Sequence, residues 1–161
     1  MEIYHGSNQR VNVPNIISGR KNLDFGCGFY TTSDFEQAKT WSIVKTNRVG
    51  YGKPTINVYN LDIDKLKTLK VLEFKSPNKD WLEFVVANRK GIIKEHKYDI
   101  VIGPIANDST IFVINSYISG NIDENTALAL LLPQKLKDQY VFLSEKALVC
   151  LNFKNEVILN E

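Results

Sequence analysis

The sequence predicts a single α+β domain. Strand-like and helix-like segments are mixed irregularly along the chain, whereas a regularly wound parallel sheet requires them to alternate. The chain has 161 residues, which is enough to bury about two thirds of the surface of the unfolded chain around one core. We therefore expect residues 1–161 to form one domain, without an internal repeat or a low-complexity tract.

The N-terminal third is expected to contain two strands and one helix. Residues 2–5 predict a first, central strand, and the aromatic and β-branched residues 29–32 predict a second. A helix is expected to follow and to end near Thr46, because Ser33 or Asp34 can cap it and apolar residues then recur on one face at helical spacing.

The rest of the chain predicts short strands mixed with short helices. Apolar runs bounded by turn residues predict strands near residues 55–61, 71–74, 98–103, 139–143 and 157–159. Capping residues predict helices that begin near Asn78, Asn107, Asp123 and Ser144. The large aromatic residues Trp81, Phe84 and Tyr98 are expected to lie in the core.

Composition sets bounds on the partners and the compartment. Twenty basic and 18 acidic side chains give a formal net charge of +2, so no strong field points to nucleic acid or to an anionic membrane. Only two cysteines, no leader and no apolar run near ~20 residues together predict a cytoplasmic protein without a membrane span. Two histidines and widely separated cysteines offer no recognisable spacing of metal ligands, so no metal is expected.

The stretch from Asp24 to Trp41 holds the pattern with the clearest chemical meaning. Gly26 and Gly28 allow a close approach of the backbone, and Tyr30 and Trp41 can face the same spot. Two electron-rich rings above a glycine-lined floor suit a flat cationic ligand such as the nicotinamide of NAD, because the face of an aromatic ring attracts a cation. The pattern also fits two ordinary core residues, and this stretch alone does not decide between them.

Three motifs in chain order carry a resemblance to a known family. These are Ile-Tyr-His-Gly-Ser at 3–7, Gly-Cys-Gly-Phe-Tyr at 26–30, and a helix that ends in Trp41. Together they resemble the catalytic domain of the ADP-ribosyltransferases, in the branch with a His, Tyr, Glu triad to which the diphtheria toxin and the poly(ADP-ribose) polymerases belong. More narrowly, the chain resembles a bacterial family assigned to that superfamily and often encoded beside a short antitoxin-like partner. That likeness spans nearly the whole chain, with further matching segments at 81–89, 98–104, 106–108 and 139–142.

The resemblance implies a fold and an activity. The expected fold is a split β-sheet core with peripheral helices, and the expected cosubstrate is NAD. The expected activity is that of a mono-ADP-ribosyltransferase, acting on an unidentified protein, nucleic-acid or small-molecule acceptor as the toxin of a toxin–antitoxin or defence pair. Two alternatives stay open: an NAD glycohydrolase, in which water is the acceptor, and a non-catalytic module that binds NAD or ADP-ribose.

The resemblance also implies roles for individual residues. His5 would hydrogen-bond the adenosine-side ribose, the backbone of Gly6 would hold the nicotinamide carboxamide, and Ser7 would add a hydroxyl contact. Tyr30 and Trp41 would sandwich the nicotinamide ring. The expected NAD-binding set is His5, Gly6, Ser7, Arg20, Tyr30, Thr31 and Trp41. A guanidinium can engage two phosphate oxygens at once, so the candidates for the pyrophosphate are Arg20 and Arg89.

One position departs from the family pattern. The family places a Glu at the start of a late strand, where it accepts from the 2′-hydroxyl of the nicotinamide ribose, and the matching residue here is Gln139. A neutral amide can hold that hydroxyl but supplies no negative charge to the oxocarbenium-like transition state, so polymer elongation is not expected. The carboxylates that could substitute are Asp108, which is the first choice although it could equally be a helix cap, Asp138 and Glu145. The expected catalytic set is therefore His5, Tyr30, Gln139 and Asp108.

Overall fold

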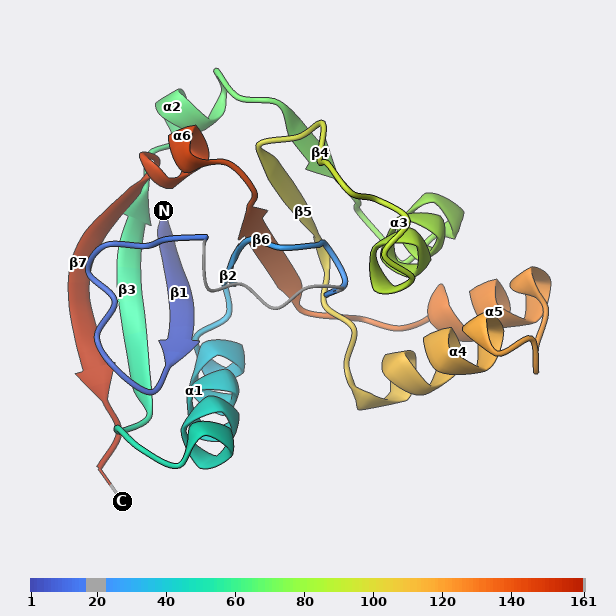
Figure 1. Ribbon diagram of the computed structural model, residues 1–161, viewed down its shortest axis with the longest axis horizontal. Helices are drawn as coiled ribbons and strands as arrows, with labels where there is room; N and C mark the ends of the chain where they lie inside the picture. Colours follow the sequence, from blue (N-terminus) through green and yellow to red (C-terminus); the bar gives the residue numbers. More distant parts are fainter. Residues whose placement is uncertain (17–22, 161) are drawn as a thin grey trace.

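A computed structural model describes residues 1–16 and 23–160 and has an α+β fold built on two sheets, shown in Figure 1. One sheet has three antiparallel strands in the order β1-β3-β7, with bounds Glu2–Ser7, Thr55–Leu61 and Leu151–Ile158. The other has four strands in the order β2-β6-β5-β4, with bounds Phe29–Thr31, Asp138–Phe142, Ile100–Pro104 and Val71–Glu73. Only β4 and β5 of this sheet pair in parallel. The α+β prediction is confirmed.

Within residues 1–16 and 23–160, one isolated bridge joins the two sheets. The backbone N–H of Tyr4 donates to the carbonyl of Thr32 at 2.8 Å, and the N–H of Thr32 donates to the carbonyl of Tyr4 at 2.9 Å. In the order β1-β3-β7, β1 lies at one edge of its sheet, so the prediction that it is central is wrong. The central strand is β3, because six of its seven residues are buried and it pairs with β1 and β7 on its two edges.

Most of the helices begin where the sequence predicts. The helices and their bounds are α1 Phe35–Val49, α2 Ile63–Leu66, α3 Lys79–Arg89, α4 Asp108–Ile118, α5 Glu124–Leu131 and α6 Glu145–Leu148. Four of the predicted caps form, because the side chains of Asp34, Asn78, Asn107 and Asp123 each accept the N–H three residues ahead. Among the described residues, none of the helices has both the length and the apolar character that crossing a membrane requires.

Helix α1 packs directly against β1 at Gly6. A Cβ atom on Gly6 would lie 2.1 Å from the carbonyl oxygen of Ala38 and 2.7 Å from the backbone nitrogen of Ser42, so only glycine allows this approach. Ala38 and Ser42 are the fully buried residues of the helix. The contact fixes Trp41, the neighbour of Ser42, beside the C-terminal half of β1.

The core has two parts. One part surrounds Trp81, which is fully buried and donates its indole N–H to the carbonyl of Pro104 at 3.1 Å. Phe84 and Tyr98 pack against this part and are themselves partly buried, so the prediction that the three aromatic residues belong to the core is confirmed. The other part joins the two sheets, because it packs Ile3 and Tyr59 of β1 and β3 with Ile100 and Phe142 of β5 and β6.

Candidate functional site

A cavity of about 820 Å³ lies where the two sheets separate. It falls within the range of about 300–1,000 Å³ that small-molecule sites occupy. Five residues predicted from the sequence line it, from β1, β2, α1 and β6: His5, Gly6, Tyr30, Trp41 and Gln139. The cavity thus brings together residues that are up to 134 positions apart in the sequence, from His5 to Gln139.

The strand β1 presents its free backbone edge to this cavity. Alternate residues of a strand direct their N–H and C=O groups to the same edge, so Gly6 points these groups the same way as Tyr4, which uses its own in the bridge to Thr32. The antiparallel register of that bridge would next pair Gly6 with Tyr30. The ladder stops before that pair, and both residues line the cavity instead. Gly6 therefore offers one donor and one acceptor to a bound molecule.

His5 is held in one orientation by two contacts. Its Nδ1 lies 2.7 Å from the carbonyl oxygen of Tyr30, which can only accept, so Nδ1 carries the hydrogen and Nε2 is left as an acceptor. The imidazole stacks on the ring of Phe29 with 4.3 Å between centroids and 28° between planes. Burial lowers the pKa of His5 from 6.5 to about 4, so the ring is neutral at pH 7.

The pKa of His5 predicts a pH dependence of stability. The unfolded chain binds a proton at this histidine below about pH 6.5, whereas the folded chain does so only near pH 4. The free energy of unfolding should therefore be highest above pH 6.5 with respect to this group and should fall as the pH is lowered toward 4. Thermal melts of the wild type and of His5→Gln across this range measure the contribution. Burial lowers the pKa of His96 as well, so His96→Gln is measured beside it to separate the contributions of the two histidines. Equal slopes of stability against pH in His5→Gln and the wild type would contradict the assignment.

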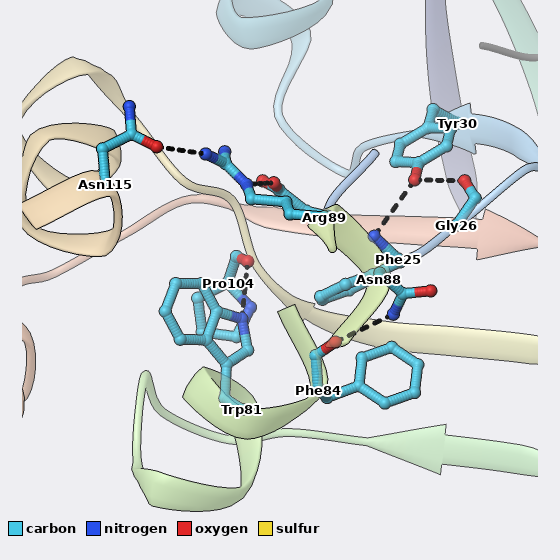
Figure 2. A network of polar contacts seen from close by, with 10 residues as sticks. Phe25, Gly26, Tyr30, Trp81, Phe84, Asn88, Arg89, Pro104 and Asn115 are labelled. Atoms are coloured by element: carbon cyan, nitrogen blue, oxygen red, sulfur yellow. Dashed lines mark hydrogen bonds and ion pairs between the residues drawn. The ribbon is translucent and has the colours of Figure 1, made fainter. Parts of the chain in front are cut away.

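Tyr30 is fixed by the loop that precedes β2. Its hydroxyl donates to the carbonyl of Gly26 at 2.6 Å and accepts the backbone N–H of Phe25 at 3.1 Å, as Figure 2 shows. Gly26 has a φ of 89°, and a Cβ there would lie 2.0 Å from the imidazole of His96, so glycine is required. Burial raises the pKa of Tyr30, which keeps the hydroxyl protonated. The hydroxyl thus anchors the loop, and the ring remains as part of the cavity wall.

Gln139 lines the cavity and carries a buried donor without a partner among the described residues. Its side chain is 3% exposed, and within the described residues its Nε2 has no hydrogen-bond partner. Leaving a buried amide donor without a partner costs about 1–3 kcal/mol. A rotation of the amide toward the cavity would let an acceptor on a bound molecule remove that cost.

Three of the predicted residues are not part of the described cavity wall, and a fourth lies outside the described residues. Thr31 Oγ1 donates to the carbonyl of Tyr140 at 2.8 Å, and the buried Ser7 is also absent from the described cavity wall. Asp108 is exposed in the first turn of α4, because the neighbouring Asn107 takes the cap position. Arg20 lies outside the described residues.

Neither of the other two candidate carboxylates lies at the cavity. Asp138 accepts hydrogen bonds from the backbone N–H and the hydroxyl of Ser33, and Glu145 is exposed in the first turn of α6. Among the described residues, no group of three or more His, Cys, Asp or Glu side chains could hold a metal ion.

Comparison with known protein families identifies the chain. Residues 1–153 match the model of a family described as "Protein of unknown function (DUF3990)". The chain belongs to the DUF3990 family. The match includes every described residue that lines the cavity. No curated protein and no solved structure matches the chain.

The cavity of this DUF3990 protein contains charged residues that sequence reasoning missed or placed differently. Asp24 is the one carboxylate that lines it within the described residues, and its Oδ1 lies 2.6 Å from Arg89 Nε. Arg89 Nη1 also donates to Asn115 at 3.3 Å (Figure 2). Arg89 was expected from the sequence as a pyrophosphate ligand; it does line the cavity, but in an ion pair.

Two further cations come from one face of α1. Trp41, Val44, Lys45 and Arg48 line the cavity at the spacing i, i+3, i+4 and i+7. That spacing is visible in the sequence and could have identified Lys45 and Arg48 once Trp41 was assigned to a site. Arg10 also lines the cavity, and its Nη1 lies 3.7 Å from Glu156 Oε1.

Proposed function

We propose that this DUF3990 protein binds NAD in the cavity and is a mono-ADP-ribosyltransferase. The observation that carries the proposal is the separation of β1 and β2 after their single bridge, which leaves the backbone of Gly6 and the ring of Tyr30 facing one cavity together with His5 and Trp41. On this proposal the two sheets correspond to the split sheet of the ADP-ribosyltransferases. The protein then acts in the cytoplasm as the toxin of a pair whose second member is a short antitoxin-like protein.

The proposed binding mode uses each wall of the cavity. The carboxamide of nicotinamide takes the N–H and C=O of Gly6, while Tyr30 and Trp41 cover the two faces of the positively charged ring. His5 Nε2 accepts a hydrogen bond from the adenosine-side ribose, and Gln139 donates its unsatisfied N–H to an oxygen of the nicotinamide ribose. This mode satisfies the buried donor of Gln139 and the free edge of β1 at the same time.

The proposed reaction breaks the bond between the ribose C1′ and the nicotinamide nitrogen. Nicotinamide leaves as a neutral molecule with the bonding electron pair, and positive charge builds on the ribose. A nucleophilic atom of the acceptor then bonds to C1′, and any proton that this atom loses goes to solvent. Gln139 supplies no negative charge there, and Asp24 is already paired with Arg89. The cavity therefore keeps its contacts with NAD before the reaction, but part of the electrostatic stabilisation of the transition state is missing.

The charge at position 139 predicts the effect of a single substitution. Gln139→Glu should raise the rate of NAD cleavage about tenfold or more, because a carboxylate beside the ribose stabilises the developing cation by a few kcal/mol. Gln139→Ala should reduce NAD binding without the gain. Initial rates of nicotinamide release measure both variants, and melting temperatures check that the Glu is tolerated at this buried position. A slower Gln139→Glu variant with unchanged NAD affinity would contradict this role for position 139.

Transfer is favoured over hydrolysis because the described residues of the cavity include no good general base. His5 has a pKa of about 4, Tyr30 stays protonated, and Asp24 is held by Arg89. Water must lose a proton when it attacks, so activation of water by these groups is weak. The cavity therefore suits an acceptor whose nucleophilic atom is reactive without a general base.

The second candidate function is NAD binding without turnover, which the neutral Gln139 favours.

An incubation with labelled NAD tests the proposal. The wild type is mixed with isotopically labelled NAD and a bacterial lysate, and free nicotinamide, free ADP-ribose and labelled macromolecules or small molecules are measured by mass spectrometry. A transferase releases nicotinamide and labels an acceptor, whereas a glycohydrolase yields free ADP-ribose only. Intact NAD together with a raised melting temperature supports the binding module. Intact NAD with no shift in melting temperature overturns the proposal.

A further inference from the structure

We propose that Lys45 and Arg48 form a diphosphate-binding site on the α1 wall of the cavity, suited to a nucleoside 5′-diphosphate group. The orientation of the ligand rests on the proposed function, with the diphosphate of NAD on this wall and the nicotinamide at Tyr30. The site itself rests on the geometry and charge of the cavity. It assigns the pyrophosphate to residues other than Arg20 and Arg89.

The position of α1 directs the two cations into the cavity. The close contact at Gly6 fixes the helix against β1, so the face that carries Trp41 also turns Lys45 and Arg48 toward the cavity. Lys45 is partly buried beside His5, and its charge contributes to the lowered pKa of that histidine. The pKa of Lys45 is itself lowered, first by burial and then by the charge of Arg48. The two cations therefore lie near each other and near the end of β1.

Neither cation has a counter-charge in the described part of the chain. Lys45 and Arg48 have no carboxylate within 4.0 Å there, whereas Arg10 lies near Glu156 and Arg89 near Asp24. The segment 17–22, which is outside that part, contains no Asp or Glu in its sequence. Lys45 is partly buried and Arg48 is exposed, so solvent screens part of their mutual repulsion, and an anion bound between them would be attracted by both charges.

The chemistry of the pair favours phosphate groups. A guanidinium engages two oxygens at once, and an ammonium is a compact point charge that suits a neighbouring phosphate. Two cations match the two negative charges of the diphosphate diester in NAD. Arg89 is less available, because its Nε is held by Asp24 at 2.6 Å and its Nη1 by Asn115. The α1 wall is thus the part of the described cavity with unpaired positive charge.

Binding of ADP tests this site separately from catalysis. The affinity for ADP and for adenosine is measured by calorimetry on the wild type, Lys45→Gln, Arg48→Gln and the double variant. Lys39→Gln is the matched control, because Lys39 is on the same helix, does not line the cavity and contacts Glu36. We expect each cavity variant to weaken ADP binding about tenfold, the double variant to weaken it further, and the control and all adenosine affinities to stay unchanged.

Two results would overturn the site. ADP that binds the wild type no better than adenosine would remove the diphosphate contact, and equal ADP affinity in the wild type and the folded double variant would assign it elsewhere. Melting temperatures establish that the variants are folded. ADP binding that depends on Lys45 and Arg48 supports the site even if NAD is never cleaved. NAD cleavage that depends on Tyr30 but not on these cations leaves the transferase proposal standing and removes this one.

Discussion

Tyr30→Ala should lower the rate of NAD cleavage at least about 100-fold. The substitution removes one face of the proposed nicotinamide sandwich and releases the two hydrogen bonds through which the hydroxyl holds Phe25 and Gly26. A displacement of about 1 Å at a reacting centre already costs about 100-fold in rate, because the near-attack geometry is lost. Nicotinamide release at saturating NAD measures the effect.

Tyr30→Phe separates the ring from the hydroxyl. The phenyl ring keeps the cavity wall, while the loop loses its anchor and the buried N–H of Phe25 loses a partner. We expect the free energy of unfolding of this variant to fall by about 1–3 kcal/mol, which lowers its melting temperature. We expect it to keep most of the cleavage rate. Full activity in a folded Tyr30→Ala variant would remove the aromatic sandwich from the mechanism.

Trp81→Ala should give the largest loss of stability. Trp81 is fully buried and its indole N–H donates to the carbonyl of Pro104, as seen in Figure 2. Truncation leaves a large void and an unpaired carbonyl, so the free energy of unfolding should fall by about 3–5 kcal/mol. Urea denaturation followed by circular dichroism measures the change.

The two tryptophans make a matched pair for that experiment. Trp41 is only partly buried and lines the cavity, so Trp41→Ala should change stability much less and should reduce NAD binding. An equal loss of stability in both variants would show that Trp41 is a core residue and would contradict its place in the proposed site.

Much of the fold could be predicted because its signals are local. The caps at Asp34 and Asn78 and the strand 55–61 depend on a few neighbouring residues, and the structure has them as expected. The strand expected at 157–159 is instead β7, which begins at Leu151, because its polar residues face solvent and hide the pattern of a strand. The edge position of β1 depends on the order of strands in space, which no local pattern encodes.

The candidate site divides in the same way. His5, Tyr30 and Trp41 could be singled out because they stand in short motifs, and they line one cavity. The pair of Asp24 and Arg89 spans 65 positions and leaves no local signal. Charged residues on a helix usually face solvent, and only the packing of α1 at Gly6 turns Lys45 toward the cavity.

Titration with NAD, followed by tryptophan fluorescence, tests most directly whether this cavity holds nicotinamide. Trp41 lines the cavity and Trp81 does not, so each tryptophan can be replaced by phenylalanine in turn. We expect a saturable change in emission below about 1 mM NAD that persists in Trp81→Phe and disappears in Trp41→Phe. No change up to that concentration, or the same change in Trp41→Phe, would contradict it.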